Sequence, residues 1–283
     1  MDRVRACIGD KRVLALVKAF LKAGILTEDG TLADTSAGTP QGSILSPLLS
    51  NVALSVLDEY IARGPGGPGA RPYERAKRRR QGLPNYRLVR YADDWCLLVA
   101  GTRQHAEALR EEIARVLAGM GLRLSPEKTL ITHIDQGLDF LGWRIQRHRK
   151  RGAARRYVYV YPAKKALKAV MVKVKTVCRQ NTNHPLVVLL HQLNRMLRGW
   201  TAYFKYGCSH ATFSYLRSYL WAEIVRWQKR KHRRTPWRQL RRLYGIWPAD
   251  GTVTLLDPAR VVAARYYYYR GVKGIAAPWP SAA

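Results

Sequence analysis

Two short strand-like runs with an Asp-Asp pair between them constrain the fold of this chain more than any other feature. The runs cover residues 86–91 and 95–100, and only Ala92, Asp93 and Asp94 separate them, so the sequence predicts a tight β-hairpin. Such a hairpin presents two carboxylates at its tip, where they repel each other unless a cation lies between them. Mg²⁺ prefers oxygen ligands, and two such ions can activate an attacking hydroxyl and stabilise a leaving oxygen in phosphoryl transfer. An ordinary turn explains the Asp pair about equally well when the pair is taken alone.

The apolar spacing predicts an α+β module up to about residue 150 and a helical module after it. Helices are expected from Asp10 to Gly24, from Ser46-Pro47 with Ser46 as the N-cap, and over 103–120. From Ala163 onward the apolar residues recur at helical spacing in successive runs. Three further strands are expected, at 130–134, 140–145 and 157–161.

Residues 63–85 show no periodicity. Glycine and proline alternate over 64–69, and a basic cluster covers 75–80. We interpret this stretch as a mobile surface loop near nucleic acid, and a solvated linker is an equally good interpretation.

The charge of the chain indicates a polyanionic partner. Fifty Lys and Arg against nineteen Asp and Glu give a net charge of +31. Residues 1–140 are close to balance, whereas residues 141–283 hold 30 basic side chains and only Glu223, Asp250 and Asp257 as acids. A membrane-surface protein is disfavoured, because aromatic residues are interleaved with the charges and no apolar span is visible.

Within the basic half, one cluster combines cations with aromatic rings that could stack on unpaired bases, and the alternative is a solvated charged face. The cations are Arg226, Lys229, Arg230, Lys231, Arg233, Arg234, Arg238, Arg241 and Arg242, and the aromatic residues are Trp227, Trp237 and Tyr244. The tyrosines at 266–269 could form an edge strand or a stacking surface, and a packing role is favoured.

A glycine-rich loop at 38–49 leads into the helix that starts at Ser46-Pro47. Backbone N–H groups of such a loop can approach phosphates or a base pair closely, and the helix N-terminus favours anions. Gln41 could hydrogen-bond a template strand or an incoming nucleotide. A plain loop before a well-capped helix is the simpler alternative.

Together these segments resemble the reverse transcriptase family, and specifically the group II intron reverse transcriptase/maturases. Five segments carry the resemblance in the family's order: Gly-Thr-Pro-Gln-Gly-Ser-Ile-Leu-Ser-Pro-Leu-Leu-Ser-Asn (38–51), Tyr-Ala-Asp-Asp (91–94), Gly121-Leu122 with Ser-Pro-Glu-Lys-Thr (125–129), Phe-Leu-Gly-Trp (140–143), and Arg-Gly-Trp (198–200) with Tyr203-Phe204.

The resemblance implies a function and a set of site residues. The function is RNA-directed DNA synthesis coupled to binding and splicing of a group II intron RNA, with a DNA primer or target and dNTPs as substrates. Asp93 and Asp94 would hold Mg²⁺, and Lys128 would neutralise or protonate the leaving pyrophosphate. The remaining residues would contact template, nucleotide or primer: Thr39, Pro40, Gln41, Gly42, Tyr91, Phe140, Leu141 and Gly142.

The fold expected from the resemblance is α+β, a partial right-hand polymerase palm followed by an α-helical thumb. The expected domains are a palm and fingers part over 1–150, a thumb/maturase part over 151–245 and a basic segment over 246–283. We expect the chain to start after the strand that carries a further metal-binding aspartate in the family, and Asp2 to be unable to replace it. A maturase that binds RNA without catalysis and a degenerate remnant are therefore the alternatives.

Cysteine and histidine residues indicate no further site. No Cys-x-x-Cys pair exists and the histidines are not grouped at ligand spacing, so a zinc site is not expected. Cys96 and Cys178 lie in apolar contexts and are expected to be core thiols. We expect a reduced, cytoplasmic protein associated with RNA or the nucleoid.

Overall fold

The computed structural model describes residues 1–22, 25–26, 32–33, 45–149, 152, 154–180 and 182–262. The glycine-rich loop before Leu45 and the tyrosines at 266–269 therefore lie outside the described residues. Contacts divide the chain into two compact units, a first unit Met1–Ile131 and a second unit Thr132–Ala283. The mixture of helices and strands confirms the α+β class. The expected domain boundaries near residues 150 and 245 remain predictions, because a division by contacts and a division by function need not coincide.

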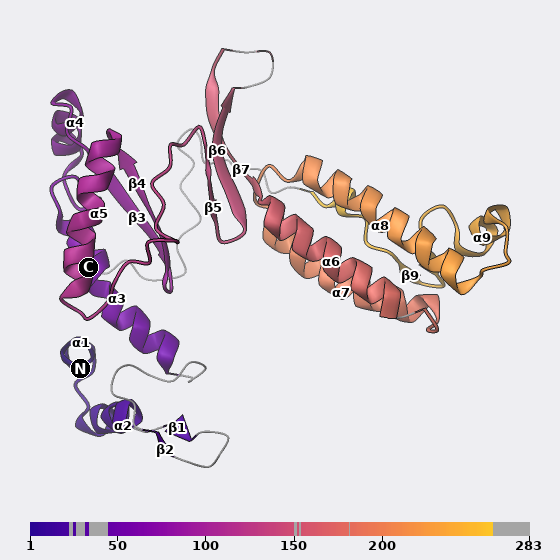
Figure 1. Ribbon diagram of the computed structural model, residues 1–283, viewed down its shortest axis with the longest axis horizontal. Coiled ribbons are helices and arrows are strands. Elements are labelled where there is room, and N and C mark those ends of the chain that lie inside the picture. Colours follow the sequence, from indigo (N-terminus) through magenta and orange to yellow (C-terminus); the bar gives the residue numbers. More distant parts are fainter. Residues whose placement is uncertain are drawn as a thin grey trace. The chain divides into compact units, whose positions relative to one another are not determined.

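In the first unit, helices α3 (Ser46–Arg63), α4 (Pro72–Arg80) and α5 (Arg103–Ala118) lie beside the hairpin of β3 (Asn85–Tyr91) and β4 (Asp94–Ala100) (Figure 1). Helices α3 and α5 contribute Leu57, Ile61 and Ile113, all almost fully buried, to a core that also includes Tyr86 of the hairpin. The elements of this unit are α1 (Asp2–Cys7), α2 (Lys11–Lys22), β1 (Ile25–Leu26), β2 (Leu32–Ala33), α3 (Ser46–Arg63), α4 (Pro72–Arg80), β3 (Asn85–Tyr91), β4 (Asp94–Ala100) and α5 (Arg103–Ala118).

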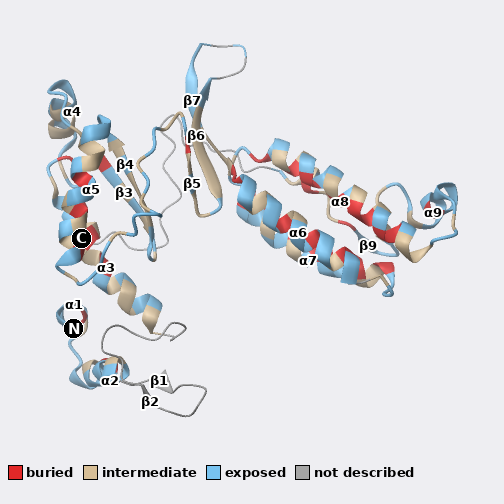
Figure 2. Cartoon of the chain, in the orientation of Figure 1, coloured by how far each residue is buried: buried red, intermediate tan, exposed pale blue. Residues whose placement is uncertain are grey.

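The second unit joins a three-stranded antiparallel sheet to a helical bundle. Figure 2 shows the buried residues along the facing sides of α6, α7 and α8. Leucines at helical spacing on α7 and α8 and the buried Trp227 form this core, as the periodicity predicted. The elements are β5 (Leu138–Phe140), β6 (Trp143–Arg149), β7 (Arg156–Pro162), α6 (Lys164–Gln180), α7 (Leu186–Phe204), α8 (His210–Lys231), α9 (Trp237–Tyr244), β8 (Ala249–Asp250), β9 (Val253–Thr254) and a 3₁₀ turn Pro258–Arg260.

The interpretation of residues 63–85 as a mobile loop is wrong. Gly66 and Gly67 are buried, and a Cβ added to Gly67 would lie 2.0 Å from the carbonyl oxygen of Ile61. The glycines therefore allow close packing against the end of α3 rather than mobility. The basic stretch that follows is helix α4.

Two strand predictions and one cap prediction also need correction. Residues 130–134 form no strand. The expected strand at 140–145 is two strands, because a turn at Leu141-Gly142 reverses the chain between β5 and β6. Helix α3 begins at Ser46 and its N-cap is Leu45.

Of the two cysteines expected to be core thiols, Cys178 lies in the core and Cys96 is only half-buried. Cys178 is fully buried in the helical bundle, and burial raises its pKa to about 12. Burial also raises the pKa of Cys96, which is half-buried in β4. Among the described residues, no helix combines the length and the apolar character needed to cross a bilayer.

Candidate active site and nucleic-acid interface

The tip of the β3–β4 hairpin holds the Tyr-Ala-Asp-Asp segment, as predicted. Tyr91 and Asp94 form the last pair of the ladder, which leaves Ala92 and Asp93 as a two-residue loop. Ala92 has a φ of 53°, a left-handed conformation that costs a non-glycine residue about 1–2 kcal/mol. Backbone strain of this kind persists where surrounding contacts hold it.

Arg90 supplies those contacts from the inner face of β3. Its guanidinium donates hydrogen bonds to the Asp58 carboxylate, at 3.0 Å to Oδ1, and to the carbonyl oxygen of Ala92, at 2.9 Å. A further hydrogen bond of 2.7 Å reaches Oδ1 of Asn51. Asn51 and Asp58 both lie on α3, so one largely buried cation ties the strained turn to this helix. The hydrogen bonds to Asp58 raise the pKa of Arg90 above its ordinary value.

Sequence reasoning missed Arg90 and its partners. The sequence did contain one indication of this contact, the position of Arg90 along its strand. Tyr86, Leu88 and Arg90 alternate on the side of β3 that packs against the helices, and a cation on an apolar face needs an acidic partner.

The two carboxylates themselves are free at the surface. Asp93 and Asp94 are exposed, and among the described residues neither has a hydrogen-bond or ion-pair partner. No third His, Cys, Asp or Glu of the described residues lies with them in a metal-binding group. Two adjacent carboxylates with no basic partner fit one Mg²⁺ ion, since this ion is commonly held by one or two carboxylates together with water and substrate phosphates.

Two other predicted parts of the catalytic site are not joined to the hairpin tip. Thr39, Pro40, Gln41 and Gly42 lie outside the described residues. Lys128 is exposed in a turn in which its backbone N–H donates to the carbonyl of Ser125. Among the described residues, no hydrogen bond or ion pair connects Lys128 to Asp93 or Asp94.

The Phe140–Gly142 segment forms the tip of the β5–β6 hairpin in the second unit. Leu141 and Gly142 have φ values of 49° and 79°, the combination typical of a type I′ turn. The Tyr203 hydroxyl of α7 donates a 2.8 Å hydrogen bond to the carbonyl of Leu141. Trp143 packs edge-on against Phe204, with ring centroids 4.8 Å apart. The tip of the β5–β6 hairpin is therefore fixed to helix α7.

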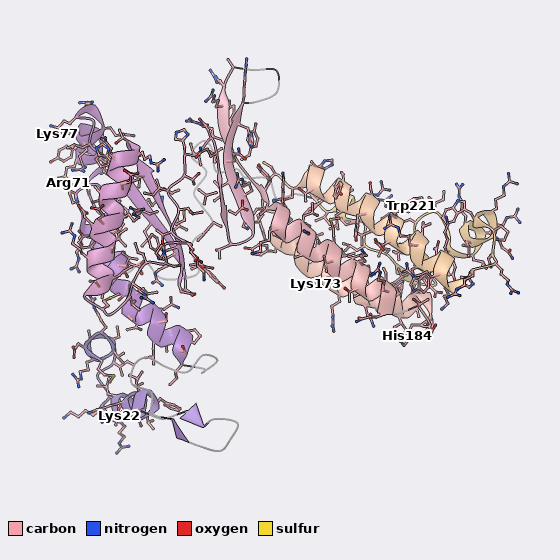
Figure 3. All side chains as sticks on the ribbon, viewed as in Figure 1. Lys22, Arg71, Lys77, Lys173, His184 and Trp221 are labelled. Carbon is pink, nitrogen blue, oxygen red and sulfur yellow. The ribbon has the colours of Figure 1, made fainter. Side chains whose placement is uncertain are left out.

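The basic cluster divides into exposed and internally bonded side chains. Lys229, Arg233, Arg234, Trp237 and Arg238 are exposed around the end of α8 and along α9, and Arg226 is exposed but also paired with the buried Glu223. Arg230 instead donates to the carbonyl of Cys178, and Lys231 donates to the carbonyl of His184. Figure 3 shows His184 at the end of the bundle where α6 and α7 meet. The idea that Trp227 stacks on bases is wrong, because its side chain is fully buried.

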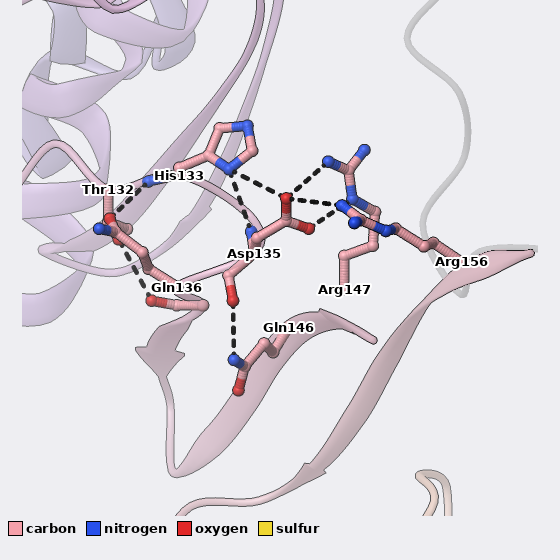
Figure 4. Close-up of polar contacts among 8 residues, drawn as sticks. Thr132, His133, Asp135, Gln136, Gln146, Arg147 and Arg156 are labelled. Carbon is pink, nitrogen blue, oxygen red and sulfur yellow. Dashed lines mark hydrogen bonds and ion pairs between the residues drawn. The ribbon is translucent and has the colours of Figure 1, made fainter. Parts of the chain in front are cut away.

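Asp135 organises a second set of cations beside the sheet (Figure 4). Its carboxylate accepts hydrogen bonds of 2.6 and 2.9 Å from Arg147 of β6, and Arg156 of β7 lies 3.4 Å away. The hydrogen bonds from Arg147 are the main reason that the pKa of Asp135 is lowered to about 2. One acid thereby holds together cations from two strands.

Comparison with known families adds independent information. Residues 3–145 match the reverse transcriptase (RNA-dependent DNA polymerase) family, and residues 167–245 match the group II intron, maturase-specific domain. The first match contains the Asp93-Asp94 tip and the β5–β6 turn, and the second contains α7, α8 and α9.

Curated relatives agree with both matches. Protein YkfC of Escherichia coli is 37% identical over 180 residues, which cover 59% of this chain and 47% of that protein. The group II intron-encoded protein LtrA of Lactococcus lactis is 31% identical over 193 residues, which cover 53% of this chain and 32% of that protein. A 91 kDa protein in the cob intron of Schizosaccharomyces pombe is 34% identical over 164 residues, which cover 44% of this chain and 20% of that protein.

The matched region thus spans between a fifth and a half of the length of these relatives. The family match covers half of the chain, and the maturase match covers most of the helical bundle. This chain belongs to the reverse transcriptase family, in its group II intron reverse transcriptase/maturase branch.

Proposed function

We propose that this chain carries the metal-binding hairpin and the RNA-binding helices of an RNA-directed DNA polymerase that also assists splicing of its group II intron. The observation that carries the proposal is the strained hairpin tip with two unpaired carboxylates, Asp93 and Asp94, inside the region that matches the reverse transcriptase family. The first unit then corresponds to part of a polymerase palm and the helical bundle to a thumb. The partners are intron RNA, a DNA primer or target, and dNTPs.

In this proposal the chain's own groups hold and orient the reactants. Asp93 and Asp94 hold Mg²⁺, which when bound lowers the barrier by neutralising charge on the phosphates and activating the primer hydroxyl. Arg90 keeps the turn in the conformation that presents both carboxylates outward. Tyr91, a residue that is 68% exposed beside them, offers a ring for the nucleotide or template base. Gln41 and Lys128 remain predicted contacts of the template and of the pyrophosphate.

Metal binding at the tip can be tested without any catalysis. Fe²⁺ bound in place of Mg²⁺ generates hydroxyl radicals in the presence of ascorbate and peroxide, which cleave the backbone near the ion. We expect cleavage next to residues 91–95 that excess Mg²⁺ suppresses and that is absent in the Asp93→Asn/Asp94→Asn variant. Glu111→Gln, an exposed acid on α5, is the matched control. Because neither tip carboxylate has a hydrogen bond or ion pair within the part of the chain that the structure describes, the double variant should unfold within about 1 kcal/mol of the original protein.

Polymerisation is tested by primer extension on an RNA template, with this chain alone and with the upstream part of the family's polymerase domain joined to it. Extension that depends on Asp93 and Asp94 in either form supports the proposal. Undiminished extension by the double Asn variant would exclude these residues from the chemistry.

A second candidate function is RNA binding without polymerisation. It is favoured by the metal-binding group at the tip, which contains only two carboxylates among the described residues. A measurement of RNA affinity tests the RNA-binding function without depending on polymerase activity. Replacing the exposed Arg233, Arg234 and Arg238 with Gln should flatten the salt dependence of binding to a structured RNA by about 0.7–0.9 for each phosphate that is no longer neutralised.

A further inference from the structure

Helix α4 forms without the apolar packing that stabilises most helices in proteins. Helices in proteins are stabilised mainly by packing an apolar face against a core. None of the nine residues of α4 (Pro72–Arg80) is buried. Its sequence holds five cations and a single acid, Glu74. A segment with this composition would ordinarily remain an irregular, solvated loop.

The protein nevertheless fixes α4 in place at both ends. At its start, Glu74 accepts a 3.0 Å hydrogen bond from the backbone N–H of Arg71 and pairs with the Arg71 side chain. At its end, Arg78 donates two hydrogen bonds, of 3.2 and 3.0 Å, to the carbonyl of Pro84. The buried Asn85, the first residue of β3, donates a 2.9 Å hydrogen bond to the carbonyl of Arg75.

The glycine segment before α4 packs against β3 and so fixes where α4 begins. Gly66 lies so close to β3 that an added Cβ would be 2.6 Å from the carbonyl of Pro84 and 2.9 Å from the ring of Tyr86. Tyr86 belongs to the core of the first unit. The position of α4 is therefore determined by the same strand that carries the Asp93-Asp94 tip at its other end.

Three of the five cations of α4 lie at the surface and do not fasten the helix. Lys77, Arg79 and Arg80 are exposed, and among the described residues none of them has an acidic partner. Tyr73 and Lys77 are spaced by one helical turn, so they share a face, and Tyr73 is 59% exposed. Figure 3 labels Arg71 and Lys77 at the end of the first unit where α4 lies. Favourable interaction with the helix dipole explains a cation or two in the last turn, but not this number on a helix without a buried residue.

We infer that α4 is a second nucleic-acid contact of this protein, separate from α8 and α9, which binds the phosphate backbone of a duplex held by the first unit. The inference rests on the proposed function, because it takes nucleic acid to be the ligand. Lys77, Arg79 and Arg80 neutralise phosphates, and Tyr73 packs beside the sugar or an unpaired base. The strand between α4 and the tip has seven residues, a length of about 20 Å. Helix α4 therefore lies well away from the Asp93-Asp94 tip, so its phosphate contacts are separate from the site where the reaction is proposed.

The test compares two variants that remove the same charge from the same unit. In the first, Lys77, Arg79 and Arg80 are changed to Gln. In the control, Arg103, Arg110 and Arg115 of α5 are changed to Gln; these are also exposed, but they share their helix with Glu107, Glu111 and Glu112. The probe is a fluorescent 20-base-pair RNA duplex, and its affinity is measured by anisotropy over a range of salt concentrations.

We expect the α4 variant to flatten the plot of log affinity against log salt by up to about 2.7, at about 0.9 per neutralised phosphate, and the α5 control to change it by less than about 0.9. Equal slopes for the α4 variant and the control would overturn the inference. If the α4 variant keeps the original slope while the variant at Arg233, Arg234 and Arg238 flattens it, the inference fails and the proposed function stands. If neither variant changes the slope, both fail.

A measurement on the unaltered protein avoids any effect of the substitutions on folding. Acetylation of Lys77 by a water-soluble ester is followed by mass spectrometry with and without the duplex. We expect the duplex to protect Lys77 several-fold. Full reactivity of Lys77 in the complex would contradict a phosphate contact at α4, and equal protection by an acidic polypeptide would contradict a contact that is specific to nucleic acid.

Discussion

Arg90 should control the conformation of the carboxylate tip, and Arg90→Lys is the perturbation that tests this. Lysine keeps the positive charge but has one ammonium group in place of the planar guanidinium, so it cannot serve Asp58, Asn51 and Ala92 together. The side chain of Arg90 is 12% exposed and that of Asp58 is 40% exposed. Hydrogen bonds to charged groups contribute about 1.5–3 kcal/mol each, and screening at the half-exposed Asp58 reduces this. We therefore expect a decrease in local stability of about 2 kcal/mol.

The assay is hydrogen exchange of the peptide that covers residues 91–100, read by mass spectrometry. A local decrease of about 2 kcal/mol corresponds to roughly 30-fold faster exchange where exchange follows the opening equilibrium. Ala92→Gly should partly restore protection in the Arg90→Lys protein, because glycine adopts a φ of 53° without strain. Asp58→Asn gives the partner variant for a double-mutant cycle, and the coupling should be at least about 0.5 kcal/mol.

Exchange of this peptide within two-fold of the original protein would refute the reasoning. It would mean that the turn holds its left-handed residue by local preference alone. No rescue by Ala92→Gly, together with fast exchange, would show that Arg90 acts on the helix α3 side rather than on the turn.

Three further predictions follow from contacts described above. Gly67→Ala should destabilise the first unit by about 1–3 kcal/mol in thermal unfolding, because the added Cβ would clash with a main-chain oxygen of α3. The control Gly9→Ala, whose Cβ would meet nothing within 4 Å, should change stability by less than about 0.5 kcal/mol. The pKa of Asp135 in the folded protein is lowered to about 2 from 3.8, so the stability that its ion pairs contribute is present above pH 4 and disappears as the pH falls toward 2. The difference in melting temperature between the original protein and Asp135→Asn should therefore shrink from pH 6 to pH 3. A constant difference would contradict the ion pairs. Tyr203→Phe removes the hydrogen bond to Leu141 and should cost about 1 kcal/mol, seen as faster exchange of residues 138–149 with unchanged exchange of the first unit.

Local patterns were sufficient where neighbouring residues decide the structure. The β3–β4 hairpin, the start of α3 and the long helices α5 to α8 follow from apolar spacing and from turn residues next to them in sequence. The Asp93-Asp94 tip could be found for the same reason, since two strands and a two-residue loop are all that it needs.

Distant contacts explain the errors. Leu141 sits in a run that is typical of a strand, and its left-handed φ is held by Tyr203, 62 residues later. Gly67 is buried because Ile61 and Tyr86 close around its segment, which composition cannot reveal. The Arg90–Asp58 pair spans 32 residues, and no local pattern indicates that these two positions meet. α4 has no apolar periodicity, so sequence could show its charge but not its helix.

The acids of the second unit give its surface an uneven tolerance of mutation. Asp135 pairs with Arg147 and Arg156, the buried Glu223 pairs with Arg226, and Asp257 pairs with Arg217 and Arg260. Exposed Lys and Arg are numerous enough that removal of any one leaves the field of the surface nearly unchanged. Removal of one of these acids instead leaves one or two guanidinium groups without a counter-charge in an already basic surface. Mutations that move an exposed cation of this unit from one surface position to another should therefore be tolerated. Mutations of its few paired carboxylates should be tolerated less, because each loss leaves cations without a counter-charge.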